Sequence, residues 1–340
     1  MRVLERSALA SLLGGLALFV ASPTAVFAAP QSTSTTTAKK APQTRASLAR
    51  SRAAAAARAR RAAVARQQRE AETPQFKRDL LGNLVPHVRA AAAIIYDPQT
   101  GAVLWGENPH EQRSIASLTK LMTAITFIAD EPNLDARIRV AREDTLRAST
   151  TYLRTGDVLS YRDLLHLALI ASDNAAARVL ARTAEGGTAA FVARMNDMAT
   201  HLGLTNTQYT EPSGLDARNM SSAYDISHLI AYASADPQLG AVMRLAEYTA
   251  RTQSRQIEIR STNKLLGLDG VDVLGGKTGF ISKAGYCLAT LLRIPQGPQV
   301  AVVVLGATNS TTRFWDARHL FNWVVGRTQG LVGGEPDAQR

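Results

Sequence analysis

Ser117 and Lys120, in the stretch IASLTKLMTA, could act together as a nucleophile and its base. Residues three positions apart lie on the same face of a helix, which suits proton transfer between their side chains. A serine hydroxyl is a poor nucleophile until another group takes its proton. A lysine can take that proton when burial or nearby positive charge lowers its pKa. The spacing alone does not settle the matter, because Ser261 and Lys264 form a second pair three apart.

A second polar cluster, Ser172-Asp173-Asn174, separates two apolar segments that are typical of helices. In such a break the side chains of Ser172 and Asn174 can both point into one cleft. Ser172 could then pass a proton to a leaving amine, and Asn174 could hold a substrate amide or the lysine. Ordinary helix capping, which Ser and Asn perform well, explains the same residues without catalysis.

A third cluster, Lys277-Thr278-Gly279, follows Gly275 and Gly276 on a segment predicted to be a strand. Glycine lets a substrate backbone lie close against a strand. The lysine charge and the threonine hydroxyl would suit a carboxylate. The alternative is a charged sheet edge that prevents strands of other chains from pairing with it.

Other catalytic classes have little support in this sequence. It has six histidines, but none lies in a familiar triad setting, and no G-x-S-x-G motif occurs. Cys287 is the only cysteine, which excludes an intrachain disulfide. It lies in the apolar stretch GYCLATLLRI, so we expect an inert, buried thiol. No metal-ligand pattern is visible, and we expect neither a metal nor another cofactor.

The N-terminal segment is typical of a secretory signal. Arg2 and Arg6 precede the apolar run ALASLLGGLALFVA, and small residues allow cleavage near Ala28. A membrane anchor is the alternative, although the run is short for a spanning helix. In both cases the folded part would lie outside the cytoplasm, and we expect a periplasmic protein.

Almost all of the net charge of +11 belongs to one segment of the 340-residue chain. Residues 30–78 carry twelve Lys and Arg against two Glu, whereas residues 79–340 carry 25 basic and 25 acidic residues. Nucleic acid is therefore not an expected partner of this exported chain. The segment 39–78 is expected to be a solvated, partly helical linker, with electrostatic contact to an anionic membrane or cell-wall polymer as the sharper alternative.

The order of the predicted elements indicates an α+β fold. AAAIIYD and AVLWGE flank the turn signal PQTG and predict a hairpin. Helices are expected at 117–129 and 161–169, after the break at 172–174, and around 188–202 and 222–235. Three strand-like segments, VDVLGGKTGF, AGYCLATLLRI and QVAVVVLGAT, then precede a closing amphipathic helix. An antiparallel sheet that holds both ends of the folded part, with helices packed on it, fits this order.

We predict four parts along the chain from these patterns. They are a signal peptide (1–28), a disordered basic linker rich in Ala and Arg (29–86), one folded domain (87–328) and a flexible tail (329–340). No internal repeat is visible.

Taken together, S-x-x-K, S-x-N and K-T-G in this order form a known catalytic set. The sequence resembles the serine penicillin-binding proteins and β-lactamases, and most closely the low-molecular-mass D-alanyl-D-alanine peptidases of serine peptidase family S11. The resemblance runs from about Ala90 to Gly326 and includes the segments RSIASLTKLMTA, TEPSGLD, SSAYDISHLI, STNKLLG and GGKTGF. It implies a β-lactamase/DD-peptidase-like fold, in which helices cover both faces of a five-stranded antiparallel sheet and a further helical region is inserted.

The resemblance also implies a role for each motif residue. Ser117 would attack the carbonyl of a D-alanyl residue and form an acyl-enzyme, with Lys120 as general base. Ser172 would pass the proton to the departing amine. The remaining roles are substrate binding by Asn174, Lys277, Thr278 and Gly279, and an oxyanion site formed by the backbone N–H groups of Ser117 and Phe280. Ser261 and Lys264 would only support the cleft.

Within that family, we expect an endopeptidase that cuts the D-alanyl cross-links of peptidoglycan. Few residues follow Gly279, which resembles the single-domain endopeptidases, and a D-alanyl-D-alanine carboxypeptidase is the alternative. Glu211-Pro212 favours a β-lactamase, but Leu215 stands where those enzymes have an asparagine. A non-catalytic peptidoglycan-binding protein is the remotest alternative. The expected partners are peptidoglycan peptide stems and, as covalent inhibitors, β-lactams, and a monomer is expected.

Overall fold

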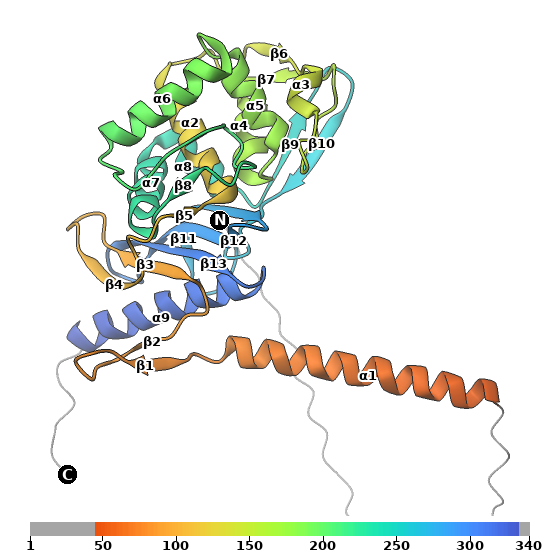
Figure 1. Ribbon diagram of the computed structural model, residues 1–340, viewed down its shortest axis with the longest axis vertical. Helices are drawn as coiled ribbons and strands as arrows, with labels where there is room; N and C mark the ends of the chain where they lie inside the picture. Colours follow the sequence, from red (N-terminus) through yellow and green to blue (C-terminus); the bar gives the residue numbers. More distant parts are fainter. Residues whose placement is uncertain (1–44, 333–340) are drawn as a thin grey trace, which may run out of the picture. The chain divides into compact units, whose positions relative to one another are not determined.

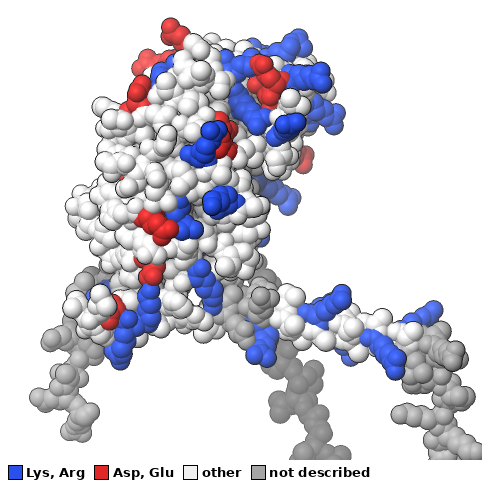
Figure 2. Space-filling view, viewed as in Figure 1, with Lys and Arg blue, Asp and Glu red and all other residues white. Residues whose placement is uncertain are grey.

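The computed structural model describes residues 45–332 and divides the chain into two units, residues 1–60 and 61–340. The described part of the first unit, residues 45–60, belongs to helix α1 (Arg45–Glu72), which continues into the second unit (Figure 1). Its side chains from 49 to 66 are exposed, and Figure 2 shows blue Lys and Arg side chains along it. The linker was predicted to be disordered and partly helical, and over Arg45–Glu72 it is one continuous helix, because alanine and arginine have high helix propensity even without an apolar face.

The second unit contains a hairpin that the sequence analysis placed in the linker. Strands β1 (Phe76–Arg78) and β2 (Leu84–Pro86) pair antiparallel. The Asp79 carboxylate stabilises their turn by accepting hydrogen bonds from Leu81 N and Asn83 N. The Phe76 ring meets the His319 ring edge-on, at 5.0 Å between centroids. The regular structure therefore begins before residue 87, the predicted start of the folded domain.

A five-stranded antiparallel sheet forms the centre of this unit, as predicted. Its spatial order is β11-β12-β13-β3-β4, so strands from both ends of the folded chain lie side by side. β11 is an edge strand of this sheet. The bounds of the strands are Ala92–Tyr96 (β3), Val103–Glu107 (β4), Asp272–Ile281 (β11), Gly285–Arg293 (β12) and Gln299–Ala307 (β13).

Successive residues of the central strand β13 face two different hydrophobic cores. Val302 and Val304 pack with α9 (Thr312–Val332), whereas Val303 and Leu305 belong to the core that contains α7 (Ala223–Ala235). Side chains of a strand alternate between its faces, so a continuous apolar strand requires cover on both. The helices on both faces of the sheet (Figure 1) satisfy that requirement.

The other helices between β4 and β11 pack on the α7 side of the sheet. The Ser160 hydroxyl caps α4 by accepting from Asp163 N, and the Asp173 carboxylate caps α5 by accepting from Ala176 N. The other bounds are Ala116–Leu118 (3₁₀ turn η1), Thr119–Ala129 (α2), Arg142–Thr145 (α3), Tyr161–Ile170 (α4), Asn174–Thr183 (α5), Gly187–His201 (α6) and Pro237–Met243 (α8). The helices predicted from periodicity are therefore confirmed.

Three small two-stranded sheets lie between these helices. The sequence analysis did not predict them, because pairs of two to five residues give little alternation to detect. Their strands are Arg113–Ser114 (β5) with Met220–Ser221 (β8), Arg137–Arg139 (β6) with Val158–Ser160 (β7), and Glu247–Arg251 (β9) with Gln256–Arg260 (β10). Within residues 45–332, no helix has the length and apolar character that crossing a membrane requires.

Candidate active site

The 3₁₀ turn η1 positions Ser117 immediately before helix α2. Ala116 adopts a positive φ of 49°, which is unfavourable for a residue with a side chain. The Thr119 hydroxyl donates to Ala116 O at 2.8 Å and fixes this turn to the first residue of the helix. Backbone strain of this kind persists where the surrounding structure holds it, often at functional sites. Ser117 therefore lies on a locally constrained turn rather than within the regular helix that was predicted.

Lys120 lies fully buried beneath Ser117, and its amine has three neighbours. Nζ is 3.0 Å from Ser117 Oγ and 2.6 Å from Asn174 Oδ1, and it donates to the backbone oxygen of Ser213. The amide and backbone oxygens can only accept hydrogen bonds. A neutral lysine amine has two protons, which these two acceptors take. Its lone pair is then left for the hydroxyl of Ser117, as a general base requires.

A further hydrogen bond fixes the orientation of Asn174. Its Nδ2 donates to Ala148 O at 2.7 Å, so Oδ1 must face Lys120. The neighbouring Asp173 carboxylate accepts from Tyr152 N at 2.6 Å and from the Thr151 hydroxyl. The polar break thus both caps α5 and presents Asn174 to the lysine, so the capping and site interpretations of this motif hold together.

Ser172 and Lys277 form a second hydroxyl–amine pair. Lys277 Nζ donates to Ser172 Oγ at 2.7 Å and to Thr278 O at 2.8 Å. Ser172 has a positive φ of 60°, which makes it another strained residue at the site. The Thr278 hydroxyl contacts that of Thr262 at 2.6 Å. The structure therefore brings the S-x-N and K-T-G segments together.

Both buried lysines have lowered pKa values. Burial lowers the pKa of Lys120 to about 7, and the Arg178 charge acts in the same direction. The carboxylates of Glu211 and Asp173 oppose that shift because they favour the charged amine. The pKa of Lys277 lies well below its ordinary value because of burial and the nearby charges of Lys120 and Arg313. A substantial fraction of Lys120 is thus neutral near pH 7.

The predicted site residues surround one open cavity of about 430 Å³. A side chain at Gly279 would place its Cβ 3.1 Å from Ser117 N, so β11 passes directly beside the nucleophile's turn. Lys120 and Lys277 lie buried behind the hydroxyl groups to which they bond. The predicted residues that line the cavity are Ser117, Ser172, Asn174, Thr278, Gly279 and Phe280.

Comparisons with known proteins find relatives among the D-alanyl-D-alanine peptidases. The peptidase family described as D-alanyl-D-alanine carboxypeptidase matches residues 81–309. A D-alanyl-D-alanine endopeptidase of Pseudomonas aeruginosa is 37% identical over 245 residues, which cover 71% of this chain and 79% of that protein. The endopeptidase of Escherichia coli is 35% identical, with 70% and 78% covered.

The chain belongs to the D-alanyl-D-alanine carboxypeptidase family of serine peptidases. The crystal structure of the Streptomyces K15 DD-transpeptidase matches this peptidase with a TM-score of 0.66 and 28% identity, over 70% of this chain and 97% of that one. The predicted DD-peptidase fold is thereby confirmed.

The second Ser–Lys pair of this DD-peptidase does not form a similar site. Lys264 is exposed, and the Ser261 hydroxyl accepts from Asn263 N at 3.2 Å. Only the intervening Thr262 reaches the cavity. The same spacing in the sequence therefore gives a bonded pair at Ser117 and Lys120, and two separate side chains at Ser261 and Lys264.

Arg313 is a site residue of this DD-peptidase that the sequence analysis missed. It lies at the start of α9, lines the cavity, and its Nη1 donates to Gly279 O at 3.1 Å and Cys287 O at 3.2 Å. It thus places a buried positive charge behind β11. No spacing signal marks Arg313, because the sheet brings it to Gly279 from 34 residues away. Cys287 itself is buried, and burial raises its pKa to about 11, as expected for an inert thiol.

Proposed function

We propose that this DD-peptidase is an endopeptidase that hydrolyses the D-alanyl cross-links of peptidoglycan through an acyl-enzyme on Ser117. The observation that carries the proposal is the contact of Ser117 Oγ with the buried amine of Lys120, whose other acceptors are Asn174 and Ser213. The names of the Pseudomonas and Escherichia relatives favour the endopeptidase reaction.

In the first step Lys120 takes the proton of the Ser117 hydroxyl as Oγ attacks the carbonyl carbon of the D-alanyl residue. The developing oxyanion accepts hydrogen bonds from the backbone N–H groups of Ser117 and Phe280. Loss of one such donor typically costs about 100- to 1,000-fold in rate. Collapse of the tetrahedral intermediate breaks the peptide bond and leaves the D-alanyl group on Ser117 as an ester.

The departing amine must receive a proton, and in this proposal Ser172 delivers it. Its hydroxyl is held by Lys277 Nζ at 2.7 Å and lines the same cavity as Ser117. The proton that Lys120 gained is returned through this hydroxyl. A water then attacks the ester and gives a proton to Lys120. The tetrahedral intermediate collapses to the acid product, and Lys120 returns the proton to the departing Ser117 oxygen.

The carboxypeptidase reaction is the second candidate, and the position of Arg313 favours it. A substrate with a terminal carboxylate would meet the hydroxyl of Thr278, with the amine of Lys277 and the charge of Arg313 nearby. An endopeptidase substrate has no such carboxylate at the bond that is cut. The same acyl-enzyme chemistry serves both reactions, so the difference lies only in the leaving group.

The β-lactamase alternative would require Glu211 to activate a water. Both oxygens of its carboxylate accept hydrogen bonds from its own loop, from Ser213 and Leu215 among others. Glu211 is therefore poorly placed to take a proton from water. We propose instead that β-lactams acylate Ser117 as lasting inhibitors.

Export to the periplasm completes the proposal. The predicted signal peptide (1–28) and the tail from 333 onward lie outside the described residues. The basic residues of the segment 39–78 would contact an anionic membrane or cell-wall polymer, and the catalytic unit would act as a monomer.

Digestion of purified muropeptides tests the proposed reaction. The substrates are a cross-linked dimer and a monomeric pentapeptide, with products resolved by mass. We expect the dimer to be split into monomers by the wild type and not by Ser117→Ala. Removal of only the terminal D-alanine of the pentapeptide would support the carboxypeptidase reaction. If neither substrate were cleaved, both proposed reactions would be contradicted.

A further inference from the structure

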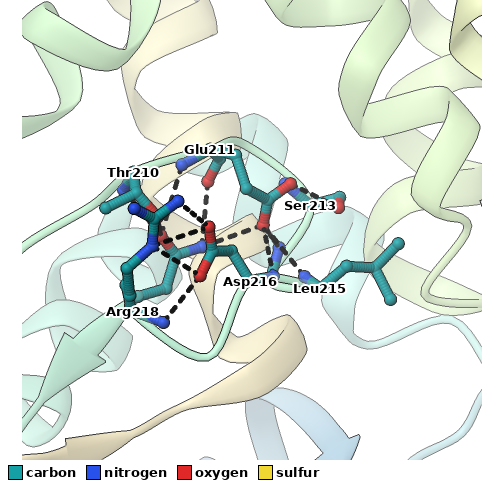
Figure 3. Close-up of polar contacts among 8 residues, drawn as sticks. Thr210, Glu211, Ser213, Leu215, Asp216 and Arg218 are labelled. Atoms are coloured by element: carbon teal, nitrogen blue, oxygen red, sulfur yellow. Dashed lines mark hydrogen bonds and ion pairs between the residues drawn. The ribbon is translucent and has the colours of Figure 1, made fainter.

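The loop that follows Thr210 contains a carboxylate surrounded by backbone N–H groups. Glu211 Oε2 accepts from Ser213 N at 2.8 Å and from the Ser213 hydroxyl at 2.6 Å. Oε1 accepts from Gly214 N, from Leu215 N at 2.9 Å and from Asn219 Nδ2 at 3.0 Å. Figure 3 shows the Glu211 side chain turned into its own loop, with Ser213 and Leu215 beside its carboxylate.

One peptide group connects this carboxylate to the amine of Lys120. The N–H of Gly214 and the C=O of Ser213 belong to the same planar unit, so they point in opposite directions. Glu211 accepts at the N–H end, and Lys120 Nζ donates at the oxygen end. Hydrogen bonds in such a chain polarise one another, so the carboxylate makes the Ser213 oxygen a stronger acceptor.

The same loop is fastened to α2 by two hydrogen bonds. The Thr123 hydroxyl donates to Pro212 O at 2.6 Å, one helical turn after Lys120. Asn219 Nδ2 donates to the Thr119 hydroxyl at 3.1 Å. Ser213 and Asn219 have no exposed surface. A shift of the loop would therefore move the Ser213 oxygen away from Lys120.

We propose that Glu211 is a positioning residue for the general base. By holding the Ser213–Gly214 peptide group, it fixes the oxygen that takes one proton of Lys120 and so directs the lone pair of that amine to Ser117. Glu211 touches neither Ser117 nor the substrate in this role. The inference rests on the proposed function, in which Lys120 takes the proton of Ser117.

Acylation of Ser117 by a fluorescent penicillin, followed over a range of pH, tests this role. Glu211→Gln keeps the size of the side chain, but it removes the charge and replaces one acceptor by a donor. We expect the acylation rate at high pH to fall about 10- to 100-fold, because small displacements of reacting groups have effects of this size. A merely structural loop residue would lower the amount of folded enzyme without moving the pH profile.

The pH profile should also shift in a defined direction. The charged groups around Lys120 are Glu211 and Asp173, which favour its protonated form, and Arg178, which disfavours it. The other titratable neighbour, Lys277, has its own pKa lowered by Lys120. Loss of the Glu211 charge therefore lowers the pKa of Lys120. The pH at which acylation reaches half of its maximum should be lower in Glu211→Gln than in the wild type.

Two further variants separate positioning from folding. Glu211→Asp keeps the charge with a shorter reach, so we expect an intermediate rate and a wild-type midpoint. Asp216→Asn is the matched control, because Asp216 lies in the same loop but its carboxylate pairs with Arg218 at 2.6 Å. Arg218 lowers the pKa of Asp216 to about 2, so this variant also removes one negative charge. We expect it to behave as the wild type.

The outcomes distinguish this inference from the proposed function. A wild type that penicillin does not label would contradict the proposed function itself. A normally labelled wild type with an unchanged rate and midpoint in Glu211→Gln would overturn only the role of Glu211. If Glu211→Gln does not fold, Glu211→Asp provides the test. The positioning role of Glu211 would be overturned if Glu211→Asp acylated at the full wild-type rate or if the midpoint of its pH profile shifted.

Discussion

At the scale of single residues, the surroundings of Lys120 determine whether the site can activate a serine. Burial lowers the pKa of its amine to about 7 from an ordinary value of 10.5. Asn174 and Ser213 take its protons, and Ser117 lies 3.0 Å away on the remaining side. The environment thus supplies both the protonation state and the direction of proton transfer.

This environment predicts how acylation by penicillin depends on pH. Only the neutral amine of Lys120 can take a proton, so the rate should rise with pH through a midpoint near 7. Well below this midpoint the rate should fall roughly tenfold per pH unit. Lys120→Ala should lose about 100- to 10,000-fold in rate while its circular dichroism stays that of a folded protein. A pH-independent rate, or near-normal acylation by folded Lys120→Ala, would remove Lys120 from the role of base.

The sequence could predict the side chains that lie in the three motifs, and it could not predict the other members of the site. Short motifs contain Ser117, Lys120 and Lys277, and the order of these motifs along the chain is specific to one catalytic set. The Ser213 oxygen is a backbone group, and any residue type would provide one. Arg313 reaches the cavity only because α9 packs behind the sheet, which no local pattern encodes.

At the scale of elements, the contact between the loop at 211–216 and the turn η1 holds the nucleophile in place. Gly214 has a φ of 83°, and a Cβ at this position would lie 2.1 Å from Ala116 O. The loop can therefore approach the strained turn only because residue 214 has no side chain. The sequence shows this glycine in TEPSGLD but gives no sign that Ala116 is its neighbour.

We predict that Gly214→Ala damages both stability and acylation. Gly267→Ala is the matched control, since Gly267 has a φ of 77° but no atom within 4 Å of the added methyl. The control should lose about 1 kcal/mol in free energy of unfolding from backbone strain alone. Gly214→Ala should lose about 3 kcal/mol or more, because overlap adds to strain. Urea unfolding measures both, and equal losses would show that the contact with Ala116 is unimportant.

The larger elements were predictable because their patterns are long. α4 and α7 follow apolar periodicity over ten and thirteen residues, and β12 and β13 are nine-residue strands composed mostly of apolar residues. The hairpin of β1 and β2 has only three residues per strand, five of its six side chains are not fully buried, and a basic segment precedes it. Its structure depends on contacts such as Phe76 with His319, which lie far apart in the sequence.

At the scale of the whole molecule, the excess positive charge and the catalytic residues lie in different parts of the sequence. The excess of Lys and Arg lies in residues 30–78. The residues that line the active-site cavity all lie within the range 117–313. A basic segment of this kind attracts anionic surfaces, and salt weakens that attraction. Binding to a surface and cleavage of the substrate should therefore be separable.

Two deletions test this separation. Removal of residues 30–72 should leave the turnover of a soluble muropeptide unchanged and abolish salt-sensitive binding to anionic vesicles. Removal of residues 30–86 also deletes β1 and β2, so it should lower the free energy of unfolding by roughly 1–3 kcal/mol through lost apolar burial. A large loss of turnover in the shorter deletion would mean that the basic segment takes part in forming the site.

The most direct test of the account is the mass of the protein after reaction with benzylpenicillin, followed by peptide mapping of the adduct. We predict one added acyl group, located on Ser117, and no adduct in a folded Ser117→Ala variant. An adduct on Ser172 or Ser261, or acylation of Ser117→Ala at the wild-type rate, would contradict the account.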